Sequence, residues 1–298
     1  MSSNDDDKDT DCQATELSVE SVTREGDLIT VDARESEASL EQAVTALREA
    51  LGSGCRRLVI TDAQPYVEPW YQTVEPWCSA LATLGSNELT SLVVDTYFQP
   101  LTRQASVYCG DVTALFRSCP MLRFAYVIGC ASLEELAHPR LEDLTLMGEP
   151  ITVATLRAVL RGPSPNVSRL ALGLAYEQSP APGVDAALLD ALGAHGLPKL
   201  TELHVASPED AAALLDGLAR SKVLSQLRVL SIQGDVFEDE ERGLAILEEH
   251  RAALSKLERL YLPLEDVMGL GDEELAAMIP GLRGTDELEA FAPSRYRG

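Results

Sequence analysis

The sequence has few cations, few aromatic residues and no long apolar run. Among 298 residues, 24 are Lys or Arg and 48 are Asp or Glu, so the formal net charge is −24. Binding to a phosphate backbone requires an excess of cations, and we therefore expect neither nucleic acid nor an anionic membrane as a partner. No stretch of about 18 apolar residues is present, and the first residues are acidic. We expect a soluble, cytoplasmic protein without a membrane span or a secretory signal.

Motifs typical of catalytic and metal sites are also absent. The sequence contains no G-x-x-x-x-G-K-[ST], G-x-G-x-x-G, H-E-x-x-H or G-x-S-x-G. Its six cysteines form no C-x-x-C pair and have no histidine at ligand spacing, which indicates neither a zinc site nor a disulfide framework. The four histidines are scattered, and we expect each to be a surface residue rather than a general base: His138, His195, His204 and His250. We therefore expect no enzyme, no metal and no cofactor.

Much of the negative charge lies near the start of the chain. The first fifty residues contain fourteen acidic and four basic side chains. Within this region, residues 1–15 are too polar to bury enough apolar surface to fold. We therefore predict that they form a disordered acidic tail. Two other interpretations stay open: an acidic surface that binds a partner, and adaptation to high salt.

The strongest pattern in the sequence is a recurring L-x-x-L-x-L hexapeptide. Its clearest copies are Leu89–Val94, Leu141–Leu146 and Leu257–Leu262. The units begin at Cys55, Leu89, Leu122, Leu141, Val167, Leu200, Leu227 and Leu257, with a weak last unit at Leu288. A pattern that recurs at this period is typical of a solenoid, in which each repeat contributes one strand and a return segment.

The spacing within the hexapeptide predicts which side chains are buried. The fourth and sixth positions are two residues apart, so both side chains point to the same face of a strand. One strand cannot bury that face alone, whereas stacked repeats share a continuous core.

Most intervals between the units leave room for a helix. The sequence predicts helices at residues 151–161, 184–194, 207–220, 238–254 and 272–279. Thr152 and Ser207 are the predicted N-caps of two of them. The unit that begins at Leu122 is too short for a full helix and is predicted to return through a single turn at Ser132–Leu136.

These repeats resemble the leucine-rich repeat family over roughly residues 55–290. The longer units resemble its ribonuclease-inhibitor-like class, which implies a horseshoe with a parallel sheet on the concave side and helices on the convex side. The Asn or Cys that usually follows the strand in this family is not consistently present, and Gly148 and Gly234 occupy comparable places. The resemblance therefore implies an α/β solenoid at residues 55–298 with irregular turns. An ordinary α/β domain with Leu-rich strands is the alternative.

Residues 16–54 do not fit the repeat. Glu16–Thr23 and Leu28–Asp32 are predicted to form a β-hairpin, with Gly26 in the turn. A helix is predicted from Ser39 to Leu51 because its apolar residues fall on one face. Such a unit could cover the open end of a solenoid, so we interpret residues 16–54 as an N-terminal cap. The same order of elements resembles the start of bacterial STAS-type regulatory domains, which leaves a regulatory switch as an alternative.

Both tryptophans lie in a short duplication that follows the first repeat strand. Val67-Glu68-Pro69-Trp70 is followed, three residues later, by Val74-Glu75-Pro76-Trp77. We predict that Pro76 starts a helix over Trp77–Leu84 and that both indoles pack on the first repeat. An exposed aromatic loop that docks a partner is the alternative, since Trp is frequent at binding hot spots.

The residues between the leucines are the candidates for binding. The third, fifth and seventh positions are predicted to face out from the concave sheet. Near the middle of the sheet these positions hold exposed aromatic and aliphatic neighbours, which mark interaction sites: Phe124, Tyr126, Ile128 and Met147. Flanking positions complete the predicted partner-binding set: Asp143, Arg169, Glu202, His204, Arg259 and Tyr261. A loop that covers Phe124 and Tyr126 is the alternative.

We therefore predict a non-enzymatic, monomeric module that binds a protein partner on its concave face. An adaptor fits this description, and so does an inhibitor or immunity protein whose negative charge would steer it to a basic target. Two alternatives stay open. One is an enzyme whose hydrolytic site is built on the solenoid surface from residues such as Asp95, Asp143 and His204. The other is a regulatory protein whose N-terminal flank acts as a switch.

Overall fold

The computed structural model describes most of the chain between residues 22 and 285. The described residues are 22–32, 41, 44–45, 47–49, 51–62, 71–73, 75–96, 106–129, 132–147, 151–175, 180–194, 197–234, 236, 238–264 and 277–285. The predicted acidic tail at residues 1–15, Trp70 and Leu288 lie outside the described residues.

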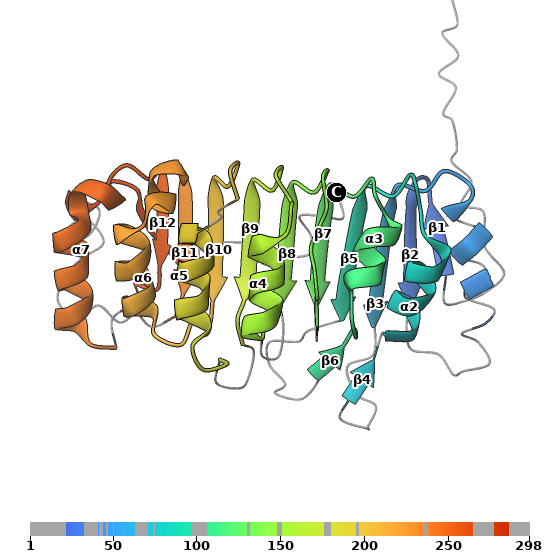
Figure 1. Ribbon diagram of the computed structural model, residues 1–298, viewed down its shortest axis with the longest axis horizontal. Coiled ribbons are helices and arrows are strands. Elements are labelled where there is room, and N and C mark those ends of the chain that lie inside the picture. Colours follow the sequence, from blue (N-terminus) through green and yellow to red (C-terminus); the bar gives the residue numbers. More distant parts are fainter. Residues whose placement is uncertain are drawn as a thin grey trace, which may run out of the picture.

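The described chain is organised around one open sheet of 11 strands (Figure 1). These strands are β1 Val22–Glu25, β2 Leu28–Asp32, β3 Arg57–Asp62, β5 Ser91–Thr96, β7 Phe124–Ile128, β8 Asp143–Met147, β9 Arg169–Gly173, β10 Glu202–Ala206, β11 Val229–Gln233, β12 Arg259–Leu262 and β13 Leu282–Gly284. Their spatial order is the order in which they occur along the chain. The pair of β1 with β2 is antiparallel, and the other pairs in this sheet are parallel.

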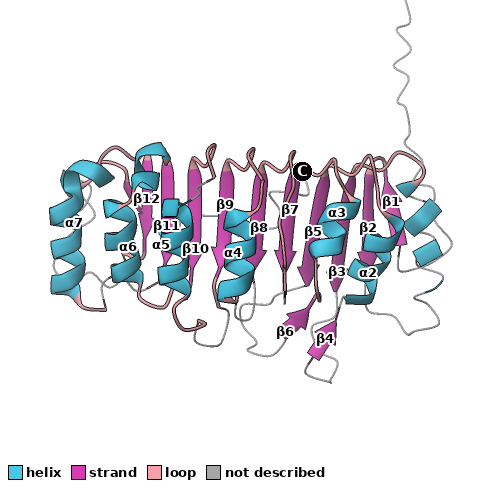
Figure 2. Ribbon diagram, in the orientation of Figure 1, coloured by secondary structure: helices cyan, strands magenta, loops and turns pink. Residues whose placement is uncertain are grey.

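Helices cover one face of this sheet (Figure 2). They are α2 Glu75–Leu84, α3 Thr113–Ser118, α4 Val153–Arg161, α5 Val184–Ala194, α6 Ala211–Arg220, the 3₁₀ helix η1 Lys222–Gln226 and α7 Glu240–Leu254. The alternation of parallel strands with helices is that of a repeating α/β solenoid, as the hexapeptide pattern predicts. Within the part of the chain that the structure describes, no helix has the length and apolar character needed to cross a membrane.

Successive repeats are joined by a ladder of backbone hydrogen bonds at the edge where the strands begin. Here the carbonyl of the second hexapeptide position accepts two bonds from the next repeat. Arg123 O, for example, accepts from the amides of Glu142 and Asp143 at 2.9 and 3.0 Å. The same arrangement recurs at the carbonyls of Asp27, Arg56, Thr90, Glu142, Ser168, Thr201 and Arg228. Equivalent positions of neighbouring repeats lie opposite one another along this ladder, and the burial of the leucines selects that register.

The inward positions build one hydrophobic core between the sheet and the helices. Leu92, Leu144 and Leu203 stand at the fourth position of their repeats and are fully buried. Burying one such side chain contributes about 1.5–3 kcal/mol to folding. The core continues through the repeats without a break, which confirms the prediction that the first, fourth and sixth positions point inward.

The N-terminal flank joins the same sheet. β1 and β2 form the predicted hairpin, and Gly26 in its turn has a left-handed conformation with φ of 61°. β2 then pairs in parallel with β3. The described residues between positions 41 and 51 are helical, as predicted, and Leu47 and Leu51 are buried. The flank therefore extends the sheet of the repeats, while its role as a cap stays a prediction.

Two helix starts show why one predicted cap is right and the other is wrong. Thr152 is the N-cap of α4, and its hydroxyl accepts a hydrogen bond from the amide of Thr155 at 3.1 Å. α6 begins later than predicted, after Asp210, whose carboxylate accepts from the amide of Ala213 at 2.8 Å. Ser207 instead occupies the turn after β10 with a positive φ of 51°. Asp210, directly before the first turn, therefore serves as the N-cap of α6 in place of Ser207.

The short unit that begins at Leu122 has no helix in residues 132–142, as predicted. His138 lies in this segment and is 1 % exposed, so the expectation of a surface histidine is wrong here. Its Nε2 donates to the Cys119 carbonyl at 3.0 Å, and its ring packs edge-on against Phe116. Gly162 permits close approach of α4 to this segment, because a Cβ there would overlap the carbonyl of Leu136.

A second, smaller sheet lies at the edge where the strands of the large sheet end (Figure 1). It consists of two parallel strands, β4 Tyr71–Thr73 and β6 Ser106–Tyr108. β4 follows β3 in the chain and β6 follows β5, so two neighbouring repeats contribute one strand each. Next to β4, α2 starts at Glu75 and Trp77 is 3 % exposed, which confirms the packing predicted for this indole.

The final described strand adds a repeat unit that the hexapeptide pattern did not predict. β13 pairs with β12 so that Leu282 lies opposite Leu260. Since Leu260 is a fourth position, this unit begins at Ile279, while the unit predicted at Leu288 lies outside the described residues. The pattern was hidden because Gly284 occupies the sixth position, where the other repeats have an apolar side chain.

We predict that the buried thiols are unreactive in the folded protein. Cys55, Cys78, Cys109 and Cys119 are buried, and burial raises the pKa of Cys55 and of Cys119. Because the thiolate is the reactive species, these four cysteines should react with DTNB only after unfolding in denaturant. Peptide mass spectrometry of the labelled protein provides the measurement. Native labelling of Cys119 at the rate seen in denaturant would contradict this packing.

We also predict that His138 makes the fold sensitive to acid. Burial lowers the pKa of His138 in the folded protein, whereas the unfolded chain titrates near 6.5. As the pH falls through that value, the unfolded state binds a proton that the folded state does not, so stability decreases. Chemical denaturation between pH 7 and pH 5 should show a smaller loss of unfolding free energy for His138→Gln than for the wild type. Equal losses in the two proteins would refute this.

Candidate functional site

Strand register places the ten predicted binding residues on the sheet face opposite the main core, which we call the second face. Third positions lie opposite one another in one row, which includes Phe124, Asp143, Arg169, Glu202 and Arg259. Fifth positions form the next row, with Tyr126, His204 and Tyr261, and Ile128 and Met147 belong to the row after it. The prediction that these positions share a face is confirmed.

The predicted exposure is right for only half of these residues. Phe124, Ile128, Met147 and Glu202 are partly exposed, and Arg259 is exposed. The other five are buried, and their expected exposure is wrong: Tyr126 2 %, Asp143 8 %, Arg169 3 %, His204 2 % and Tyr261 6 %. Each of these five side chains lies between register partners on both adjacent strands, which reduce its exposure. The role of all ten in binding stays a prediction.

A buried polar network occupies the middle of the second face. Its centre is Arg169, whose Nη1 donates to Asp143 Oδ1 at 2.7 Å and to Thr145 Oγ1 at 3.2 Å. On the other side, Arg169 Nε lies 3.8 Å from Glu202 Oε2, and the same oxygen lies 3.8 Å from His204 Nε2. We call these five residues the polar network. A guanidinium this buried is stable only when it is paired, so the network holds its members in fixed positions.

An apolar cluster lies beside the polar network, on β3, β5 and β7. Val59, Val93 and Tyr126 are buried and pack against one another, separately from the main core. Three partly exposed side chains surround them: Leu28, Phe124 and Ile128. The ring of Phe124 also carries the guanidinium of Arg123, 5.3 Å from its centroid. We call these six apolar residues the apolar cluster.

The predicted binding set omits three members of the apolar cluster: Leu28, Val59 and Val93. Val93 is the fifth position of the repeat that begins at Leu89. Val59 is the fifth position of the repeat that begins at Cys55, so the rule used for the other repeats would have found it. Leu28 was assigned to the cap, although β2 continues the register of the repeats and places Leu28 opposite Arg57. The place of Leu28 in the apolar cluster therefore follows from the pairing of β2 with β3, which the sequence alone does not reveal.

Met147 owes its position to a glycine on the next strand. It lies opposite Gly173, and a Cβ on Gly173 would come within 3.0–3.3 Å of three Met147 side-chain atoms. The missing side chain thus gives Met147 room to lie across β9. Arg259 and Tyr261 are separated from the polar network by β11, and Arg259 Nη1 lies 3.5 Å from Tyr261 Oη.

Among the described residues, the helix side carries one group of side chains at metal-ligand spacing. Ligand atoms of Asp216, Glu249 and His250 lie within 4.8 Å of one another. His250 Nε2 is 2.7 Å from Asp216 Oδ1, and this hydrogen bond lowers the pKa of Asp216. Arg220 pairs with Asp216 at 3.0 Å and with Glu249 at 3.2 Å. One guanidinium therefore already pairs with both carboxylates, and the group joins α6 to α7.

Comparison with known proteins supports the fold and nothing finer. No known protein family matches the sequence, and no curated protein matches it either. Among solved structures, the crystal structure of a protein from Bacteroides fragilis is similar, with a TM-score of 0.61 and 15 % sequence identity. The match covers 85 % of this chain and 72 % of the other. The repeating α/β architecture thus has a counterpart of known structure.

We predict that Asp143 and Arg169 stabilise the fold as a pair, so that the effects of their substitutions are energetically coupled. Arg169→Met alone should lower the free energy of unfolding by about 3–5 kcal/mol, because it leaves a buried carboxylate without its cation. The double variant Asp143→Leu with Arg169→Met should lose less than the sum of the two single variants. Urea denaturation of the four proteins measures both effects. Additive losses would contradict a direct interaction between these side chains.

Proposed function

We propose that this chain is a leucine-rich repeat protein that binds a protein partner through the second face and carries out no catalysis. The repeat assignment is supported by the hexapeptide register, in which the leucine positions are buried and successive strands pair in parallel. The horseshoe curvature typical of that family and the capping role of residues 16–54 are parts of the same proposal.

One observation carries the binding proposal: partly exposed apolar side chains meet next to a rigid polar network. Phe124 and Ile128 border the apolar cluster, and Met147 lies opposite Ile128 on β8. Exposed aromatic, aliphatic and Met side chains in contact are enriched at the centres of protein interfaces. These three side chains are the anchors of the proposed interface.

The surroundings of the anchors favour tight binding. Tyr126 is buried beneath Phe124 and Ile128, and the Arg169–Asp143 pair fixes the strands beside them. Side chains that are already ordered lose little conformational entropy when a partner binds, which leaves more of the contact energy as affinity. Glu202 and Arg259 carry opposite charges on the same face, so the overall charge of −24 does not by itself favour a basic partner at this surface.

The hydrolytic alternative has less support from the geometry. Asp143 is held in an ion pair with Arg169, which stabilises its carboxylate and occupies one of its oxygens. His204 is 2 % exposed, and its Nε2 lies 3.8 Å from Glu202 Oε2. A general base needs hydrogen-bond reach to a substrate, and a buried imidazole does not offer it. The side chain of Asp95 lies outside the described residues.

The test compares two double variants as baits for partners in extracts of the source cells. Phe124→Ala with Ile128→Ala truncates two anchors. Val153→Ala with Leu244→Ala truncates two partly buried apolar side chains on the helix side and serves as the matched control. Partners are identified by quantitative mass spectrometry against an unrelated bait, and the affinity of the main partner is then measured with purified proteins.

We expect the anchor variant to bind at least about tenfold more weakly than the wild type, since each hot-spot truncation costs more than about 1 kcal/mol. The control should bind like the wild type. Equal binding by the anchor variant and the control would contradict a role for the second face.

A further inference from the structure

The two edges of the large sheet carry opposite charge. At the edge where the strands begin, the described segments 52–56, 85–90, 119–123, 137–142, 162–168, 197–201, 221–228 and 255–258 contain seven cations and three acids. We call this edge the basic edge, and its cations are Arg56, Arg123, Arg140, Lys199, Lys222, Arg228 and Lys256. In a protein of net charge −24, a positive edge that runs from β3 to β12 is unexpected.

The opposite edge is strongly acidic, and helix capping explains it. Its described acids are Asp111, Glu134, Glu135, Asp185, Glu209, Asp210, Glu238, Asp239, Glu240 and Glu241, and Arg242 is its cation. Asp210 and Asp239 cap α6 and α7, where the helix dipole favours negative charge. A cavity of about 590 Å³ lies between these two helix starts. Asp210 and Arg242, which form an ion pair, are both part of its lining. This edge therefore has a structural role.

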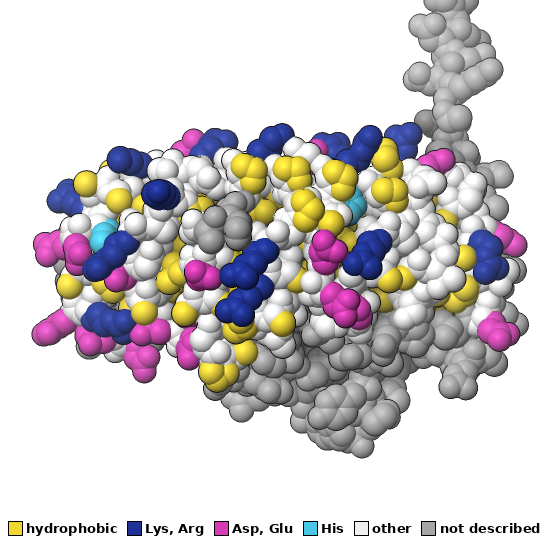
Figure 3. All heavy atoms as spheres, viewed as in Figure 1, with side chains coloured by type: hydrophobic (Ala, Val, Ile, Leu, Met, Phe, Trp, Pro, Cys, Tyr) yellow, Lys and Arg dark blue, Asp and Glu magenta, His cyan; other side chains and the backbone are white. Residues whose placement is uncertain are grey.

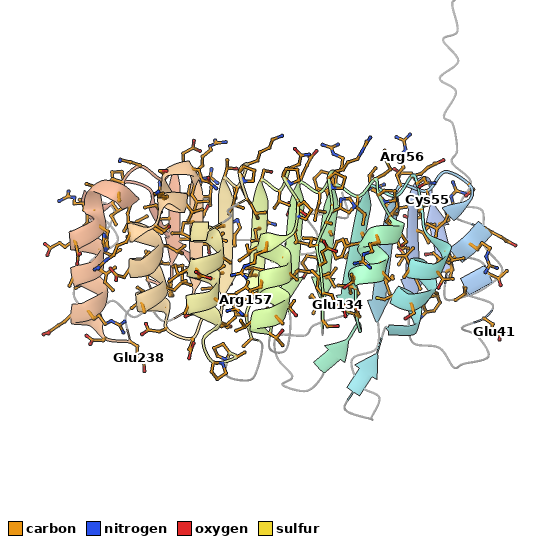
Figure 4. The ribbon with its side chains drawn as sticks, viewed as in Figure 1. Glu41, Cys55, Arg56, Glu134, Arg157 and Glu238 are labelled. Atoms are coloured by element: carbon orange, nitrogen blue, oxygen red, sulfur yellow. The ribbon has the colours of Figure 1, made fainter. Side chains whose placement is uncertain are left out.

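Helix capping does not explain the basic edge. Six of its seven cations lie in loops, outside any α-helix or 3₁₀ helix, so the helix dipole does not require them. The figures show the polarity directly: Lys and Arg side chains follow the upper edge in Figure 3, and Figure 4 places Arg56 at that edge and Glu134 and Glu238 at the lower one. The backbone ladder runs along the same edge and holds Arg56, Arg123 and Arg228 in register.

Only some of these cations are neutralised within the protein. Arg123 forms two hydrogen bonds with the Glu142 carboxylate at 2.9 and 2.7 Å, and Arg228 does the same with Glu258 at 2.7 and 2.7 Å. Lys199 donates to Asn166, an uncharged partner. The remaining four are exposed and have no carboxylate partner among the described residues: Arg56, Arg140, Lys222 and Lys256. These four charges are distributed from β3 to β12.

We propose that the basic edge is a docking site for an extended, acidic polypeptide segment of a partner protein. Seven strand steps separate β3 from β12, which corresponds to about 34 Å at the usual strand spacing. An extended segment of about ten residues spans this distance. Four unpaired cations spread over this distance match a sparsely charged acidic segment better than a nucleic-acid duplex, which carries one negative charge per about 1.7 Å. This surface is distinct from the second face, and the inference does not depend on the proposed function.

The experiment uses the full chain and three fluorescein-labelled probes: a ten-residue Glu peptide, a ten-residue Lys peptide and a ten-nucleotide single-stranded DNA. Binding is measured by fluorescence anisotropy at 50 and 200 mM NaCl. Arg56→Ser with Arg140→Ser removes two unpaired cations from the basic edge. Arg157→Ser with Arg242→Ser removes the same charge elsewhere and is the matched control, since Arg157 lies on α4 and Arg242 on the acidic edge.

We expect the Glu peptide to bind, to bind more weakly at the higher salt concentration, and to lose about fivefold in affinity in the edge variant. The control variant should bind the Glu peptide like the wild type. An equal loss in both variants would show an effect of net charge alone and overturn the docking site. Absence of Glu-peptide binding, or tighter binding of the DNA than of the Glu peptide, would also overturn it.

Discussion

The double hydrogen bonds at the second position of each repeat are the constraint on which the rest of the structure depends. Each of these carbonyls accepts the amides of two consecutive residues in the next repeat, as Ser168 O does from Thr201 and Glu202. Neighbouring strands make this contact in one register, which the burial of the leucines selects. A slip by one residue would exchange the two faces of the sheet, so the register that buries the leucines also places Arg169 and Tyr126 on the second face.

The functional surfaces follow from that register. Third positions of neighbouring repeats meet in one row, so an Asp on β8 and an Arg on β9 can form a buried pair although 26 residues separate them in the sequence. The same register brings valines of β3 and β5 together with Tyr126 in the apolar cluster. The second positions, whose carbonyls accept the ladder hydrogen bonds, place Arg56, Arg123 and Arg228 along the basic edge. The same register thus positions the apolar cluster on the second face and the cations of the basic edge.

The sequence predicts the parts of this structure that depend on local periodicity. Buried leucines, the start of α4 at Thr152 and the absence of a helix after β7 all follow from spacing and from capping. The burial of Tyr126 could not be predicted, because it depends on valines from two other repeats and on partly exposed neighbours. His138 was misjudged for the same reason: its partners, Phe116 and the Cys119 carbonyl, belong to the preceding segment of the chain. Spacing identifies the face of a side chain, whereas its exposure is set by tertiary contacts.

The central claim is that one continuous ladder aligns the repeats, and amide hydrogen exchange measured by NMR tests it most directly. The amides of Asp143, Arg169, Glu202 and Val229 each donate to the carbonyl of the preceding repeat. If the ladder is continuous, these four amides exchange slowly and with similar protection, because they open only when the sheet unfolds. Fast exchange at one of them, with strong protection at its neighbours, would show that the ladder is broken at that repeat and would contradict the account.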